Sequence, residues 1–401
     1  MKTRRPARTL AVVLALLALA GCEREARRLG GLPFKAHLPA SCSHINDPLV
    51  SKRQWGSRVG WIALRMLTGD KVKYYGLIFG IAFSTLLIAQ QSTLFVNLML
   101  RASAAIWDVT DADSWVMDSR AEFIDGTKPL PSTDLYRVRG VAGVAWAVPN
   151  LRQGATVRTA GGELEQVSVI GLDDSTLIGL PRRILRGSLA DLSAPDSLFI
   201  DDVGSRKLFP NVDPVGQEIE LNDRRAVIRG VVDANPSFTS GVLLYTQYSN
   251  ALNYVPGTRN RMTFVLARAG EGQDVAETAR RIEAATGLKA RTQREFASDS
   301  IYYVAANTGI PINFGLTVLL GFVVGVAIVG LTFSLFIRDN IKQFGALKAI
   351  GVTNSKIRGM VALQAGWIGF IGYGIGIGLA TAFIVIGGNN SDTFKGFYVP
   401  W

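Results

Sequence analysis

The chain has 401 residues, a formal net charge of +11, two cysteines and two histidines. All four of those residues precede residue 45, which excludes a disulfide, a zinc site and a histidine-based triad from Asn46 onward. The sequence has no G-x-x-x-x-G-K-S/T pattern, so the chain is not expected to hydrolyse ATP itself.

The basic excess lies in short segments. Residues 101–313 contain 23 Lys and Arg against 26 Asp and Glu, whereas residues 51–73 contain six against one and residues 338–360 five against one. Short basic segments beside apolar stretches are typical of loops that face anionic cytoplasmic lipid. Nucleic-acid binding needs one basic face on a domain, so membrane lipid is expected as a partner and nucleic acid is not.

Residues 1–49 precede the apolar part of the chain. After a basic start and an apolar stretch, Leu19-Ala20-Gly21-Cys22 resembles the end of a bacterial lipoprotein signal, which implies lipidation of Cys22. The alternative is an uncleaved anchor helix, although the apolar stretch is short for a membrane span. The remainder of this segment is interpreted as linker.

Residues 50–73 predict an interfacial amphipathic helix. Its apolar stripe is Trp55, Val59, Ile62, Ala63 and Met66, with Arg58 and Arg65 on another face. A plain surface helix is the alternative. Residues 74–100 then predict the first transmembrane helix.

Residues 101–313 predict a mixed α+β domain. The patterns favour helices at Thr133–Arg139 and Val275–Ala285, the second ended by Gly287. Strands are expected at Gly143–Val148, Leu164–Ile170 and Leu288–Thr292, with a hairpin of Gln217–Leu221 and Arg225–Val232 about Asn222-Asp223.

Two further spans follow. Residues 314–337 predict the second transmembrane helix, 338–360 a basic loop, 361–386 a third helix, and 387–401 a tail. Glycines four residues apart let helix backbones approach closely in lipid, which points to packing roles for Gly321, Gly325, Gly374 and Gly378. The alternative is that glycine is simply common in membrane helices.

The two basic segments fix the expected orientation. Because short basic loops stay cytoplasmic, residues 101–313 and the tail are expected outside. A lipidated Cys22 would reverse every later segment. We therefore expect residues 1–49 to be an upstream extension or fusion that is not part of the functional chain, with Val50 as an alternative start.

Several stretches match a known family. They are Trp61-Ile-Ala-Leu-Arg-Met-Leu, Leu135-Tyr-Arg-Val-Arg-Gly-Val, Val169-Ile-Gly-Leu-Asp-Asp and Gln343-Phe-Gly-Ala-Leu-Lys-Ala-Ile-Gly-Val-Thr-Asn-Ser-Lys-Ile. Over residues 51–401 the chain resembles the permease subunits of MacB/FtsX-like ABC transporters, most closely the DevC-type exporters. The resemblance implies an α+β membrane protein with an extracytoplasmic domain inserted between the first and second transmembrane helices. The family has four spans, so a fourth is expected or the chain is truncated.

The resemblance also implies a function. It is that of a non-catalytic permease subunit of an export complex in the bacterial inner membrane, acting as a homodimer. ATP and Mg would be bound by a separate ABC ATPase, and a periplasmic adaptor and an outer-membrane channel would receive the cargo. The ATPase-coupling helix would be about Ile341–Ile350, ended by Gly351. Its residues are Lys342, Gln343, Phe344, Gly345, Ala346, Leu347, Lys348, Ala349, Ile350 and Gly351.

Within that loop, Phe344, Leu347, Ala349 and Ile350 are expected to fill a groove on the ATPase, the alternative being a solvated basic loop. Three other functions compete with export. They are an FtsX-like regulator of periplasmic cell-wall hydrolases, a lipoprotein, and a tethered hydrolase that would use the acidic pairs Asp173-Asp174 and Asp201-Asp202. No residue is predicted to be catalytic or to bind a cofactor or metal.

Overall fold

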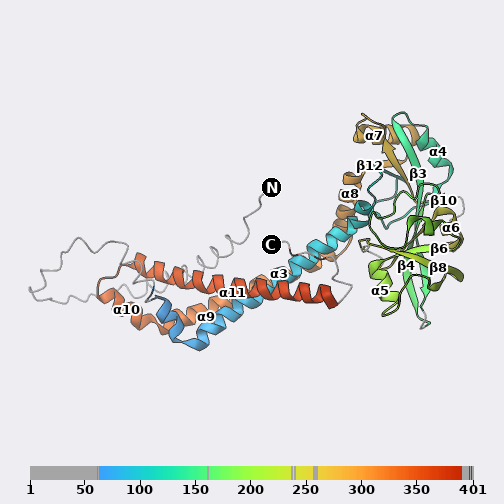
Figure 1. Ribbon diagram of the computed structural model, residues 1–401. Coiled ribbons are helices and arrows are strands. Elements are labelled where there is room, and N and C mark those ends of the chain that lie inside the picture. Colours follow the sequence, from blue (N-terminus) through green and yellow to red (C-terminus); the bar gives the residue numbers. More distant parts are fainter. Residues whose placement is uncertain are drawn as a thin grey trace, which may run out of the picture. The chain divides into compact units, whose positions relative to one another are not determined.

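The computed structural model describes residues 61, 63–159, 162–235, 238, 241–255, 261–390, 397 and 399. The predicted lipidation site Cys22, and Trp55, Val59 and Ile62 of the amphipathic stripe, lie outside the described residues. The chain divides into two compact units (Figure 1). Among the described residues, the helical unit contains those up to Ser92 together with Phe314–Ile386, and the sheet unit contains those of Thr93–Asn313 together with residues 387–390, 397 and 399.

Three of the described helices are long and apolar enough to cross a membrane. They are α3 (Lys71–Asp108), α9 (Ile310–Asp339) and α11 (Asn354–Asn390). Each extends past the apolar stretch from which it was predicted, because an apolar window marks only the part suited to hydrocarbon. The 38 residues of α3 extend over about 57 Å, against about 30 Å for a bilayer core.

A short helix precedes α3. Residues 61 and 63–69 are helical, and the helix ends at Asp70. Ala63 and Leu67 are fully buried while Trp61 is 59% exposed, so its described residues are amphipathic. Between α9 and α11 lies α10 (Ile341–Ala349).

The sheet unit is built from short strands and helices. The strands are β1 (Ser114–Met117), β2 (Leu130–Pro131), β3 (Val144–Arg158), β4 (Leu164–Leu172), β5 (Ile184–Arg186), β6 (Ser197–Asp201), β7 (Glu218–Leu221), β8 (Arg224–Val232), β9 (Leu243–Gln247), β10 (Arg261–Met262), β11 (Phe264–Ala269) and β12 (Lys289–Thr292). The helices are α4 (Thr133–Arg139), η1 (Leu189–Ser193), α5 (Asp202–Leu208), α6 (Tyr248–Tyr254), α7 (Val275–Thr286) and α8 (Gln293–Asn307).

Strand β3 belongs to both halves of the sheet. Its first half pairs with β11 in the order β12-β1-β11-β3, and its second half pairs with β4. The second half closes into a ring, β3-β4-β9-β6-β8-β7, because β7 pairs with both β8 and β3. Leu151, Val169, Ile200, Leu221 and Ile228 belong to the apolar cluster of this ring, and closure leaves these strands without a free edge.

The mixed α+β fold is confirmed, and several elements are where their residues predicted them. Helix α4 has the predicted bounds. Asn222 and Asp223 have φ of 47° and 62°, the left-handed values that a two-residue hairpin turn between β7 and β8 requires. Gly287 ends α7 at φ 70°.

Candidate functional site: the α10 coupling segment

Helix α10 is held to the rest of the helical unit by Phe344. This side chain is 8% exposed and belongs to an apolar cluster with Phe333 and Phe336 of α9 and Leu67 of the short helix. Leu347 packs against the same cluster. Phe344 and Leu347 therefore join α10 to an apolar cluster that α9 and the short helix share.

Polar contacts fix both ends of α10. At the start, the side-chain amide of Asn340 donates to the carbonyl oxygen of Phe336 at 2.9 Å. The backbone N–H of Phe344 donates to the carbonyl oxygen of Asn340 at 3.0 Å. At the end, Gly351 adopts φ 92° and Val352 N–H donates to Leu347 O at 3.1 Å. The left-handed glycine turns the chain from α10 toward α11.

The remaining side chains of α10 point away from the cluster. Ile350 is 79% exposed and Ile341 39% exposed. The other exposed members of the predicted coupling segment are Lys342, Gln343, Gly345, Ala346, Lys348, Ala349 and Gly351. Phe344 is buried in the apolar cluster of the helical unit and Leu347 is partly buried against it, so Ala349 and Ile350 are the exposed members of the four residues predicted to fill a groove on the ATPase. The coupling role of the segment stays a prediction.

Two polar residues that the sequence analysis did not single out fasten this end of the unit. Gln364 of α11 is fully buried, and its amide donates to the carbonyl oxygen of Ala63 at 2.7 Å. Lys73 forms an ion pair with Asp70 at 2.8 Å and contacts Asp339, the last residue of α9. A glutamine within an apolar span is the signal that marks the first of these contacts.

Glycines place α9 against α3. The Ser84 hydroxyl donates to the carbonyl oxygen of Gly321 at 2.9 Å. A Cβ added at Gly325 would lie 2.1 Å from the Ser84 Oγ, which leaves no room for a side chain. The Gly321–Gly325 pair thus lies where the two helix backbones approach closely.

On α11 the close approach uses a different pair from the predicted one. A Cβ at Gly376 would lie 2.6 Å from the carbonyl oxygen of Ala82, and one at Gly372 would lie 2.7 Å from the Cβ of Ile81. A Cβ added at Gly374 or Gly378 would have no atom of a neighbouring helix within 4 Å. Within the described part of the chain, α3 therefore packs against Gly372 and Gly376, and the packing role predicted for Gly374 and Gly378 stays a prediction.

The acidic pairs proposed for a hydrolase have structural roles. Asp201 is fully buried and accepts from the backbone N–H groups of Gly204 and Leu243 at 3.0 and 2.7 Å, which caps α5. Asp202 pairs with Arg206 at 3.0 Å, one turn along the same helix. Neither carboxylate resembles an acid or base aimed at a substrate.

The other pair stabilises turns. Asp174 accepts from the Ser249 backbone and hydroxyl at 3.0 and 3.1 Å. Partial burial raises the pKa of Asp173, but hydrogen bonds from Ser175 and Thr176 outweigh burial and leave that pKa below its usual value. A catalytic acid would need the opposite shift. Among the described residues, no three His, Cys, Asp or Glu side chains are grouped so as to hold a metal ion.

Two family models match the chain. One, described as a MacB-like periplasmic core domain, matches residues 75–285, and the other, described as FtsX-like permease C-terminal, matches residues 315–401. No curated protein matches.

The solved structures to which the chain is similar include the extracellular domain of the noncanonic ABC-type transporter YknZ from Gram-positive bacteria. It is 17% identical with a TM-score of 0.34, over 45% of this chain and 98% of that one. The periplasmic region of MacB from Actinobacillus actinomycetemcomitans is 17% identical with a TM-score of 0.35, over 51% and 96% respectively.

Proposed function

Because this chain belongs to the MacB/FtsX-like family of ABC transporter permeases, we propose that it is the permease subunit of an export complex in the bacterial inner membrane. A separate ATPase subunit binds ATP and Mg and docks on α10. The domain between α3 and α9, which lies outside the cytoplasm, delivers cargo to a periplasmic adaptor and an outer-membrane channel. The active form is a homodimer. The permease has a mechanical role and no catalytic one.

The observation that carries this proposal is the combination of a fixed inner face and a free outer face on α10. Phe344 and the turns at both ends hold the helix, so a force applied to it is passed to the bundle and is not absorbed by a loose loop. Ile350 and the lysines at 342 and 348 remain exposed for a partner. An exposed apolar residue on a segment that also carries two exposed lysines suits a groove with an acidic rim.

Continuity of the helices supports the same role. The cluster around Phe344 includes Leu77 and Ile78 of α3, and α3 is one unbroken helix from Lys71 to Asp108. A rigid helix transmits a displacement at one end to the other, which is a common element of switching transitions. Movement of α10 therefore has a direct route along α3.

The test is copurification of the tagged chain with its ATPase from its native host. We expect a P-loop ATPase in the purified complex, and we expect Ile350→Asp to reduce its recovery about tenfold or more, as loss of a central apolar contact does. The matched control is Val72→Asp, which also replaces an exposed β-branched aliphatic residue by aspartate, at a position on α3 that is 83% exposed. Equal recovery from both variants would contradict docking on α10.

The regulator alternative draws on the same structure. The FtsX-like match covers α10, α11 and most of α9, and the mechanical relay suits a hydrolase regulator as well as an exporter. The identity of the extracytoplasmic protein that copurifies with the complex distinguishes the exporter from the regulator. An adaptor supports export, and a cell-wall hydrolase supports regulation.

A further inference from the structure

The carboxyl end of α3 is capped by a residue from far along the chain. The last carbonyl groups of a helix have no partner within the helix. The side-chain amide of Gln293 donates to the carbonyl oxygen of Ile106 at 2.9 Å and to that of Val109 at 2.6 Å. Gln293 is the first residue of α8, the helix that leads toward α9. One side chain thus bridges the two helices through which the sheet unit continues into the spans.

The two helices also touch farther along. Met99 and Ala102 of α3 share a buried apolar cluster with Val304 of α8. Because Gln293 meets residues 106–109 whereas Val304 meets residues 99–102, α3 and α8 run side by side in opposite directions. The apolar cluster brings the helices together, and the Gln293 amide lies at the end of the pair nearest the sheet.

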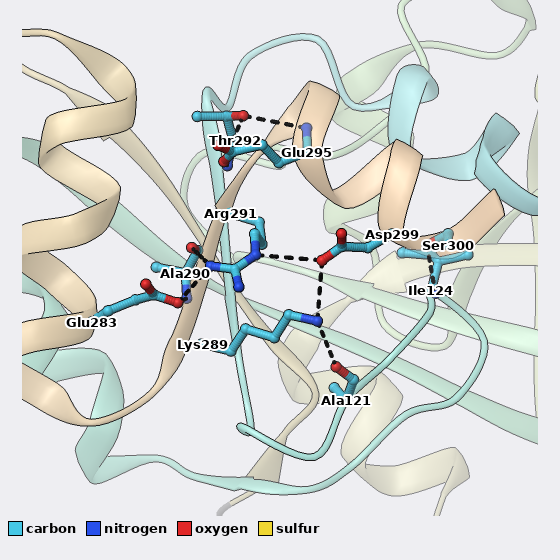
Figure 2. A network of polar contacts seen from close by, with 10 residues as sticks. All are labelled: Ala121, Ile124, Glu283, Lys289, Ala290, Arg291, Thr292, Glu295, Asp299 and Ser300. Atoms are coloured by element: carbon cyan, nitrogen blue, oxygen red, sulfur yellow. Dashed lines mark hydrogen bonds and ion pairs between the residues drawn. The ribbon is translucent and has the colours of Figure 1, made fainter. Parts of the chain in front are cut away.

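The start of α8 is fastened to the sheet unit on its other sides (Figure 2). Asp299 accepts from Arg291 Nε at 3.3 Å and forms an ion pair with Lys289 at 3.2 Å, which joins α8 to β12. The Ser300 hydroxyl accepts from the backbone N–H of Ile124 at 3.3 Å. Thr292 and Glu295 form a reciprocal cap on the first turn. The first two turns of α8 therefore move with the sheet.

We propose that Gln293 is a positioning residue that clasps α3 to α8, so that the sheet unit moves both helices together as one lever. The inference rests on the proposed transport function for its purpose, but the clasp itself is a structural claim with its own test. Ile106 of α3 and Phe296 of α8 also share a buried apolar cluster at this end of the pair. Apolar packing has no directional preference, so without the clasp the end of α3 could shift against α8, and movement arriving along α3 would not be passed fully to the domain.

The clasp depends on the hydrogen bonds that the Gln293 side chain donates. Two variants distinguish this donation from the size and shape of the side chain. Gln293→Glu keeps the length of the side chain but removes both donors and places a negative charge on the carbonyl end of α3. Gln293→Lys keeps donors and places a positive charge there. For α8 alone the effects are reversed, because an acidic residue is favoured in the first turn of a helix and a basic one is not. A clasp and a simple α8 cap therefore predict opposite orders.

The experiment measures the distance between α3 and α8 by pulsed electron paramagnetic resonance on the full chain in lipid nanodiscs. Nitroxide labels are attached at Trp107→Cys and Ser298→Cys, two exposed residues near the Gln293 end of the pair, after Cys22 and Cys42 are replaced by serine. With Gln293 or Gln293→Lys we expect one narrow distance distribution. With Gln293→Glu we expect a longer-distance component whose population rises about tenfold, as loss of two hydrogen bonds allows.

Only that pattern supports the clasp. A narrow distribution for Gln293→Glu, or a broad one for both variants, would overturn it. If Gln293→Glu does not yield folded chain, Gln293→Met, which also lacks donors, takes its place with the same expectations. The measurement needs no ATPase or adaptor, so its failure is distinguishable from failure of the transport proposal, which the copurification experiment tests separately.

Discussion

At the scale of single residues, the glycines of α11 show what spacing can and cannot predict. Gly372 and Gly376 have the same separation as Gly374 and Gly378, so the G-x-x-x-G pattern alone gives two equivalent solutions. The structure selects the first pair because the backbone of α3 at Ala82 lies against it. Choosing between the pairs requires the position of a helix almost three hundred residues away in sequence, which no local pattern contains.

The first prediction follows from that choice. Gly376→Ala is expected to destabilise the bundle by about 1–3 kcal/mol, because its Cβ would meet the Ala82 carbonyl oxygen, a backbone atom that cannot move aside. The matched control Gly378→Ala has open space and gains helix propensity, so its stability should be unchanged or higher. Thermal unfolding of the chain in detergent measures both. An equal loss for the two variants would show that the packing face is wrongly assigned.

At the scale of elements, the β7–β8 hairpin was predictable because its signal is local. An Asn-Asp pair between two alternating apolar runs favours a two-residue turn, and both residues adopt the required positive φ. The second role of Asn222 was not predictable. Its side chain accepts from the Thr156 backbone N–H and donates to the Tyr254 carbonyl oxygen, both at 2.9 Å. These partners come from β3 and α6, which only the closed ring of strands brings to the turn.

The hairpin gives a second prediction, with opposite signs at adjacent residues. Asp223→Gly should stabilise the sheet unit by a few tenths to about 1 kcal/mol, because glycine adopts φ 62° without strain. Asn222→Gly gains the same freedom but loses two hydrogen bonds, and should destabilise by about 1–2 kcal/mol net. Chemical denaturation followed by tryptophan fluorescence compares them. If both substitutions stabilised, the Asn222 side chain would have no structural role beyond the turn.

At the scale of the whole molecule, the sequence predicted the order of membrane and soluble parts because apolar length and charge placement are properties of contiguous segments. Strand pairing was not predictable in the same way. β1 pairs with β12, and β3 extends through both halves of the sheet, although the local pattern indicated a strand only as far as Val148. The position of α10 was predictable only in part. Its helix and glycine stop are local signals, whereas the inward turn of Phe344 depends on the neighbouring helices.

The last prediction concerns orientation. Two basic segments, residues 51–73 and 338–360, oppose translocation and should keep α10 in the cytoplasm with the sheet unit outside. A lipidated Cys22 would place the following segment outside and reverse this arrangement. Ile350→Cys and Tyr302→Cys, 79% and 75% exposed, report the two sides by reaction with a membrane-impermeant PEG-maleimide in right-side-out vesicles. The parent chain with its two native cysteines gives the background shift in electrophoretic mobility.

We expect an added mobility shift for Tyr302→Cys in intact vesicles and for Ile350→Cys only after lysis, because the two basic segments outweigh one short signal. The reverse pattern would make the lipoprotein-like start the dominant signal and would remove α10 from the compartment that holds ATP.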